Sequence, residues 1–111
     1  MSEDMNAEVE AVLRQARRLQ SLMDEQLDKM ASESFTAADE TETVEVTLNG
    51  HHWLQDVYIQ DGLLRLGAET VEGRVNEALQ KASADAAASI DADRERIDAV
   101  VAEITAEMTQ E

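Results

Sequence analysis

The chain has 111 residues, 43% of them hydrophobic but only 3% aromatic, and its 25 acidic residues against 9 basic ones give a formal net charge of −16. A chain of this length is expected to form one domain with a thin core, which a partner subunit would help to stabilise. The absence of cysteine excludes disulfides and thiolate metal sites, and the charge taken alone argues against DNA binding, which depends largely on Lys and Arg.

The first residues, MSEDMNAEVE, are acidic and lack both the basic and the apolar region of a secretory signal. No apolar run approaches the roughly 20 residues of a membrane span. We therefore expect a soluble, cytoplasmic protein that does not enter the membrane.

Residues 6–30 are predicted to form an amphipathic helix, because apolar side chains recur at spacings of three and four. These are Val9, Val12, Ala16, Leu19, Met23, Leu27 and Met30.

Between these apolar positions lies the dense cationic patch of the chain, Arg14, Arg17 and Arg18. The three arginines are candidates for contact with a partner or with phosphates. Alternatively they form ordinary surface pairs with acids such as Glu10 and Asp24, worth less than about 1 kcal/mol each.

Residues 34–60 are predicted to form an antiparallel sheet, with a short strand near 34–38 and a hairpin after it. Asn49-Gly50 stands between two alternating runs and predicts a two-residue type I′ turn. This turn would pair Val46 with Trp53 and Leu48 with His51. The buried face of the sheet, serving as core or dimer contact, is then expected to contain Val44, Val46, Leu48, Trp53, Val57 and Ile59.

His51 and His52 are the two histidines of the chain. Consecutive strand residues point to opposite faces, so the pair is not expected to chelate one metal ion, and we interpret both as residues that begin a strand. The sequence has no G-x-S-x-G elbow and no Gly-rich phosphate loop. We expect no enzyme, no metal, no cofactor and no small-molecule substrate.

Asp61-Gly62 is predicted to form the turn after the sheet, with Gly67 as the boundary of a second helix over residues 68–107. Apolar residues step by four, three and four from Val71 and again from Ile97. Since the chain has no proline, this segment is either one long helix or two helices with a break near residues 89–93.

The predicted architecture is α+β in a single domain: a helix, two or three antiparallel strands, then a long helix. A small sheet with one apolar face and two overhanging helices would leave much hydrophobic surface exposed. We therefore expect a homodimer in which the sheets meet across a twofold axis.

The segment VEVTLNGHHWLQDVYIQDGLL, with the helices before and after it, resembles the YbaB/EbfC nucleoid-associated family over residues 8–90. The resemblance implies an α-β-β-β-α homodimer with joined sheets and projecting helices, and several members bind DNA with little sequence preference. By the same resemblance, Asn49, Gly50 and His51 would be structural turn positions, and the arginine patch would contact phosphates.

The segments SFTAADETETVEVTLNGHHWL and DGLLRLGAETVEGRVNEAL resemble a branch of this family associated with type VII secretion in mycobacteria. That branch implies a cytosolic accessory factor that binds and stabilises secretion substrates or their chaperones, whereas the wider family implies binding to DNA in the nucleoid. Against DNA stands the tail from Asp91 to Glu111, with seven acids and two bases. The methionines at 23, 30 and 108 would either pack within the dimer or grip a partner helix.

Overall fold

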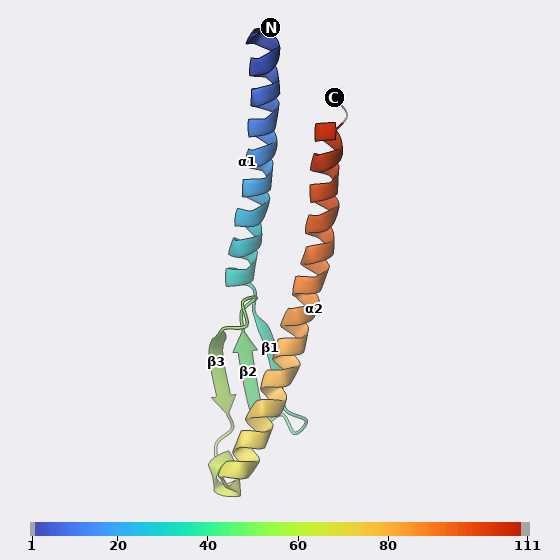
Figure 1. Ribbon diagram of the computed structural model, residues 1–111. Helices are drawn as coiled ribbons and strands as arrows, with labels where there is room; N and C mark the ends of the chain where they lie inside the picture. The colour runs from blue at the N-terminus through green and yellow to red at the C-terminus, as the bar shows by residue number, and fades with distance from the viewer. Residues whose placement is uncertain (1, 110–111) are drawn as a thin grey trace. The chain divides into compact units, whose positions relative to one another are not determined.

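The computed structural model describes residues 2–109, and the side chains of residues 6–107. Met108 lies outside the described side chains. The elements confirm the predicted α-β-β-β-α order and are, in sequence, α1 Ser2–Ser32, β1 Phe35–Ala38, β2 Val44–Leu48, β3 Leu54–Ile59, the short 3₁₀ helix η1 Leu63–Leu66, and α2 Ala68–Thr109 (Figure 1).

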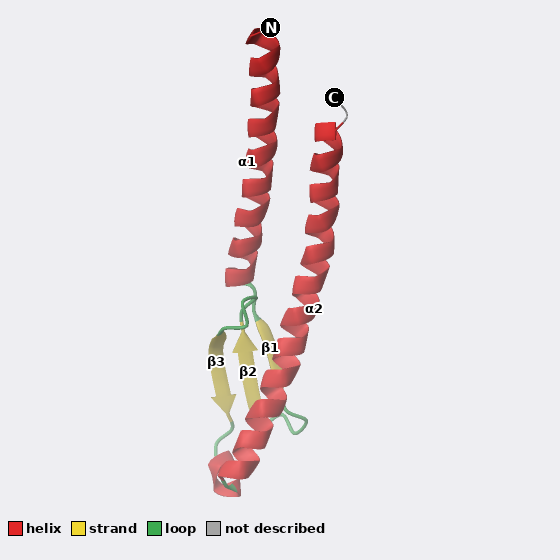
Figure 2. Cartoon of the chain, in the orientation of Figure 1, coloured by secondary structure: helices red, strands yellow, loops and turns green. Residues whose placement is uncertain are grey.

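The contacts of the chain gather in two compact units. The sheet unit comprises Lys29–Asp91, and the helix-pair unit comprises Met1–Asp28 with Ala92–Glu111. Figure 2 shows the three strands and the helices that contribute to these units. Each unit is described by itself below.

The second helix begins at Ala68 as predicted and continues through residues 89–93 without a break. Gly67 precedes it with a φ of 98°, in the left-handed region that favours glycine. The 3₁₀ helix η1 was not predicted. None of the described helices is long and apolar enough to cross a membrane.

The sheet has the strand order β1-β2-β3 and both pairings are antiparallel. Opposite Val46 lies Val57, and opposite Val44 lies Ile59. The predicted pairing of Val46 with Trp53 and of Leu48 with His51 is therefore wrong. The register shifts at a bulge between Thr47 and Leu48, so that Leu48 lies opposite Leu54. Leu54 is the first residue of β3.

The hairpin loop explains this difference in register. The Asn49 N–H donates to the Trp53 carbonyl at 3.0 Å, and the His52 N–H donates to the Asn49 carbonyl at 3.0 Å. His52 has a φ of 64°, so the loop is a three-residue turn with a left-handed third residue, not a two-residue type I′ turn. The Asn49 side-chain oxygen accepts from the His51 and Trp53 N–H groups at 2.9 and 3.0 Å.

Gly50 lies in the hairpin turn, as predicted, and it also contacts α1. Its N–H donates to the Met30 carbonyl at 2.7 Å, so the loop supplies a donor to a carbonyl in the last turn of α1. A Cβ at position 50 would lie 2.6 Å from the Met30 Cα and 2.8 Å from the Met30 carbonyl oxygen. Only glycine allows this close approach of loop and helix.

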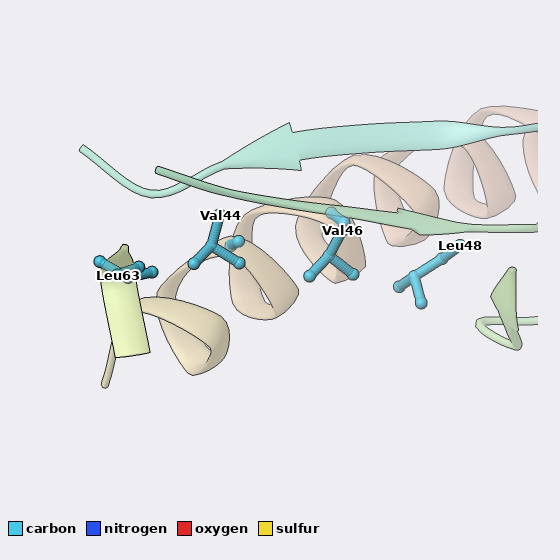
Figure 3. Packing of buried hydrophobic residues seen from close by; sticks show 6 residues of the cluster. Val44, Val46, Leu48 and Leu63 are labelled. Carbon is cyan, nitrogen blue, oxygen red and sulfur yellow. The ribbon is translucent and has the colours of Figure 1, made fainter. Parts of the chain in front are cut away.

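The core of the sheet unit lies between β2 and the first part of α2. Val44, Val46 and Leu48 point to the same side of β2, with Leu63 from η1 beyond Val44 (Figure 3). The helix covers this face with two fully buried alanines, and the cluster consists of Val44, Val46, Leu48, Leu63, Ala78 and Ala82. The chain's own helix therefore buries the valine face, which corrects the expectation that a second subunit is required to cover it.

The other predicted face residues are distributed differently. Ile59 is half-buried and packs against the core, but Val57 is 38% exposed and Trp53 67% exposed. Trp53 lies in the hairpin loop instead of on β3, and its ring stacks on that of His51 with centroids 5.1 Å apart. Its expected place as an anchor on the buried face of the sheet is wrong for this chain taken alone.

Asp39 organises the turn between β1 and β2 and is 2% exposed. One of its carboxylate oxygens accepts from the N–H groups of Thr43 and Val44 at 2.7 and 2.8 Å. The other accepts from the N–H and hydroxyl of Thr41 and from the Thr43 hydroxyl. Burial by itself would raise the pKa of Asp39, but the hydrogen bonds from Thr41, Val44 and Thr43 outweigh it and hold this pKa far below its usual value.

Gly50→Ala is expected to destabilise the protein by about 1–3 kcal/mol, because the added methyl overlaps the backbone of Met30. The control is Gly73→Ala within α2, where an added Cβ meets nothing within 4 Å and the gain in helix propensity is about 0.5–1 kcal/mol. Urea unfolding followed by circular dichroism at one protein concentration measures both variants. Equal effects of the two substitutions would contradict the proposed role of Gly50.

Asp39→Asn is expected to lower stability at neutral pH, because the ionised carboxylate is the form that the five donors stabilise. The folded-state pKa lies below the ordinary value of 3.8, so this contribution is complete above that value and is lost as the pH falls through the folded-state pKa. The difference in stability between wild type and variant, measured by thermal unfolding, should shrink below about pH 4. Asp85→Asn, which removes one charge from an exposed position, is the control, and a difference independent of pH would refute the assignment.

Candidate partner-binding site

In the helix-pair unit, α1 and the last part of α2 run in opposite directions (Figure 1). The buried Gln26 side chain donates to the Asp93 carboxylate at 2.9 Å and accepts from Arg96 at 3.2 Å. Leu22 and Ile104 are the buried apolar residues of this unit. A polar bridge with few alternative partners fixes the register of two helices more strictly than apolar contacts alone.

Most of the apolar stripe predicted for the first helix is not covered within this chain. Its residues Val9, Val12, Met23 and Leu27 are all more than half exposed, whereas the neighbouring positions Leu22 and Gln26 are buried. The stripe is therefore largely exposed in this chain, although Leu19 and Met30 are half-buried.

The three predicted arginines lie close together in the middle of α1, but they differ in their partners. Arg18 forms an ion pair with Glu107 of α2 at 2.9 Å. Among the described side chains, neither Arg14 nor Arg17 has an acid within ion-pair distance. The alternative that all three arginines are satisfied by surface acids such as Glu10 and Asp24 is therefore not what the structure contains.

These arginines border a groove between α1 and the end of α2, which we call the arginine groove. Its volume is about 460 Å³. Leu22, Val100 and Ile104 give it an apolar part, and the residues that line it are Arg14, Arg17, Arg18, Ser21, Leu22, Glu25, Val100 and Ile104. A smaller hollow beside it shares Arg14 and Arg17 and adds Glu10 and Leu13.

The arrangement of the arginine groove suits a ligand with two properties. Guanidinium groups bind carboxylates or phosphates through charge-assisted hydrogen bonds, and two of the three guanidinium groups have no such partner within the described chain. The apolar side chains beside them suit a hydrocarbon group. Of the residues involved, sequence reasoning found the arginines and the apolar Leu22 on the same helix, but it missed Val100 and Ile104 of α2 as their neighbours. The apolar step from Ile97 to Ile104 was the available signal.

A second exposed surface is the β3 edge, which we define by Trp53, Leu54, Val57 and Tyr58. Trp53, Leu54 and Tyr58 are each more than half exposed. Since β3 ends the strand order, one side of its backbone has unpaired N–H and C=O groups, and such an edge can accept another strand.

The two histidines lie in the hairpin loop before β3, so the interpretation that they begin a strand is wrong. Among the residues whose side chains are described, no group of three or more His, Cys, Asp or Glu residues is placed to hold a metal ion. His51 contacts Trp53, and His52 takes the left-handed position of the turn.

One family model and two relatives match nearly the whole chain. The model of the YbaB/EbfC DNA-binding family matches residues 5–110. The ESX-1 secretion-associated protein EspL of Mycobacterium tuberculosis strain CDC 1551 / Oshkosh is 46% identical over 109 residues, which cover 97% of this chain and 95% of that protein. EspL of Mycobacterium tuberculosis strain H37Rv matches with the same values.

A solved structure shares the fold. The crystal structure of the uncharacterized protein HP0035 from Helicobacter pylori superposes with a TM-score of 0.58 at 19% identity, covering 78% of this chain and 87% of that one. Together with the helix, three antiparallel strands and long helix described above, the match over residues 5–110 shows that the chain belongs to the YbaB/EbfC DNA-binding family.

Proposed function

We propose that this protein is a non-catalytic accessory factor of type VII secretion, which binds secretion substrates or their chaperones in the cytoplasm and stabilises them. The observation that carries the proposal is its 46% identity, across 97% of the chain, to the ESX-1 secretion-associated protein EspL. The relative's name gives the association with secretion, and the binding and stabilising role is our inference from the surfaces of this chain.

Two kinds of exposed surface support a binding role. The β3 edge and the apolar stripe of α1 present large hydrophobic side chains to solvent, which in folded proteins is typical of interaction sites. The arginine groove adds a place where cations and apolar side chains lie together.

We further propose that the protein is a homodimer joined through the β3 edge. The apolar side chains of this edge and its unpaired backbone groups would be covered if two copies of β3 paired antiparallel across a twofold axis. This contact replaces the expected dimer over the valine face, which α2 already covers.

Binding to DNA in the nucleoid is the second candidate function. It is favoured by the family's DNA-binding description and by Arg14 and Arg17, which have no ionic partner among the described side chains. The net charge of −16 opposes it, because a polyanion is repelled at long range and few cations are available to displace counterions.

Deleting the gene in its native host is expected to lower the steady-state amount of at least one type VII secretion substrate, because an unbound client is degraded faster. Quantitative mass spectrometry of whole cells measures this, and the tagged full-length protein should co-purify the same substrate. A tag-only strain is the control. Unchanged substrate amounts together with no substrate in the purified fraction would contradict the secretion role.

An electrophoretic mobility shift assay distinguishes the DNA-binding role from the secretion role. It is carried out at ~150 mM salt, where weak electrostatic binding to duplex DNA is largely suppressed. A shift that is lost when Arg14, Arg17 and Arg18 are changed to Glu would favour the nucleoid role. No shift at micromolar protein removes that role.

Light scattering is expected to give twice the chain mass for the wild-type protein and one chain mass for Leu54→Lys, because the new charge at the β3 edge, opposite the apolar Leu48, would be buried without a partner in the dimer. The control is Val9→Lys, a similarly exposed apolar position on α1, which should leave the dimer intact. A single chain mass for the wild type would refute the dimer, and dissociation by Val9→Lys alone would move the contact to α1.

A further inference from the structure

We propose that the arginine groove binds an acidic amphipathic helix of a protein partner. The groove would recognise an apolar side chain and a carboxylate that lie three or four residues apart on that helix. The inference rests on the proposed secretion role, for which it names the class of partner segment and the place where that segment binds. It concerns the helix-pair unit alone.

The first argument is local charge. In a chain with a net charge of −16, the groove has three arginines against Glu25 on its lining. Only Arg18 among the three is neutralised within the described chain, by Glu107. Arg14 and Arg17 also line the neighbouring hollow with the exposed Leu13, so the free cations lie between this side chain and the half-buried Val100 of the groove.

The second argument is that the unit already contains one example of this recognition. The last part of α2 is itself acidic and amphipathic, and it contacts α1 with Ile104 buried and Glu107 paired to Arg18. These two residues are three positions apart, so they lie on one face of the helix. A partner helix with the same spacing would place its apolar side chain against Val100 and Leu22 and its carboxylate near Arg14 or Arg17.

The third argument distinguishes this partner from a nucleic acid. A duplex presents phosphates without an apolar group for Leu22, Val100 and Ile104, and its many charges meet the repulsion of the whole chain. An acidic helix with a few carboxylates meets less repulsion and uses the apolar part of the groove. Helices of about 15 residues span about 22 Å, which is comparable to the stretch of α1 from Glu10 to Glu25 that lines the groove and its neighbouring hollow.

The test uses the full-length protein and a synthetic fluorescein-labelled helical peptide of about 15 residues with Leu and Glu at i and i+3 spacing. Fluorescence anisotropy should show saturable binding that weakens with added salt. Arg14→Glu with Arg17→Glu should weaken it at least about tenfold, because charge-assisted hydrogen bonds are replaced by repulsion. The control is Arg65→Glu with Arg94→Glu, which makes the same change in net charge at two other exposed arginines and should bind like the wild type.

Three further probes decide the chemistry. A peptide with Gln in place of Glu should lose binding, and so should a scrambled peptide of the same composition that is no longer amphipathic. Equal binding of either peptide, equal loss in both arginine double variants, or no binding of the original peptide would overturn the proposal. A short DNA duplex should displace the labelled peptide less readily than the unlabelled peptide does. If the duplex displaced it at a lower concentration, the proposal would be overturned in favour of nucleic acid.

The result is separable from the proposed function. If a secretion substrate co-purifies equally with the wild type and with the Arg14→Glu, Arg17→Glu variant, the secretion role stands and the groove is not its binding site. If the peptide binds as expected but no secretion protein is recovered, the groove proposal stands and the secretion role fails.

Discussion

The close contact between β2 and α2 is the constraint on which the sheet unit depends. Val44, Val46 and Leu48 project from one side of a single strand, and the helix meets them with Ala78 and Ala82. Small side chains let the helix backbone approach the sheet closely, so three branched residues are buried by one helix without a second layer of large side chains. Because the inner face is closed in this way, the large apolar residues that remain exposed are mostly those on the β3 edge and on α1, with Leu64 and Leu66 of η1 among the others.

The element order and the boundaries at Gly62 and Gly67 follow from the sequence. Glycines and turn residues separate the segment in which apolar residues alternate from the segment in which they recur every three to four residues. The hairpin register does not. Asn49-Gly50 is a strong local signal for a two-residue turn, but the N–H of Gly50 is used by the Met30 carbonyl, a contact between residues that are distant in sequence. Tertiary contact with α1 therefore decides the loop length, and the Trp53 position changes with it.

The candidate site was predictable only in part, and for a similar reason. The arginines are visible as a cluster in one helix, but whether each has a partner depends on α2, whose Glu107 reaches Arg18 and leaves Arg14 and Arg17 without a pair in the described chain. The sequence predicted the apolar stripe of α1 but not which face of the helix contacts α2, and the face that does so contains Gln26, which is bonded to Asp93. A single buried polar pair can outweigh a wider apolar stripe in choosing the face of a helix, since a broken polar pair would leave both groups without partners.

Net charge and local charge have separate consequences in this molecule. The excess of acids acts over the distance of a Debye length, about 8 Å at physiological ionic strength, and it affects how any polyanion approaches. The guanidinium groups of α1 act at contact distance. A protein with a negative net charge can therefore bind a negatively charged ligand, provided that the ligand has few charges and the site also offers apolar contacts.

The composition of the arginine groove also decides which chemistry can reach it. The chain has two lysines, Lys29 and Lys81, and neither lines the groove. Lysine acetylation therefore cannot neutralise this surface, and amine-reactive cross-linkers would not capture a molecule held there through the groove residues themselves. Control of such an interaction would have to come from the ligand, whose carboxylates or added phosphates set its own charge.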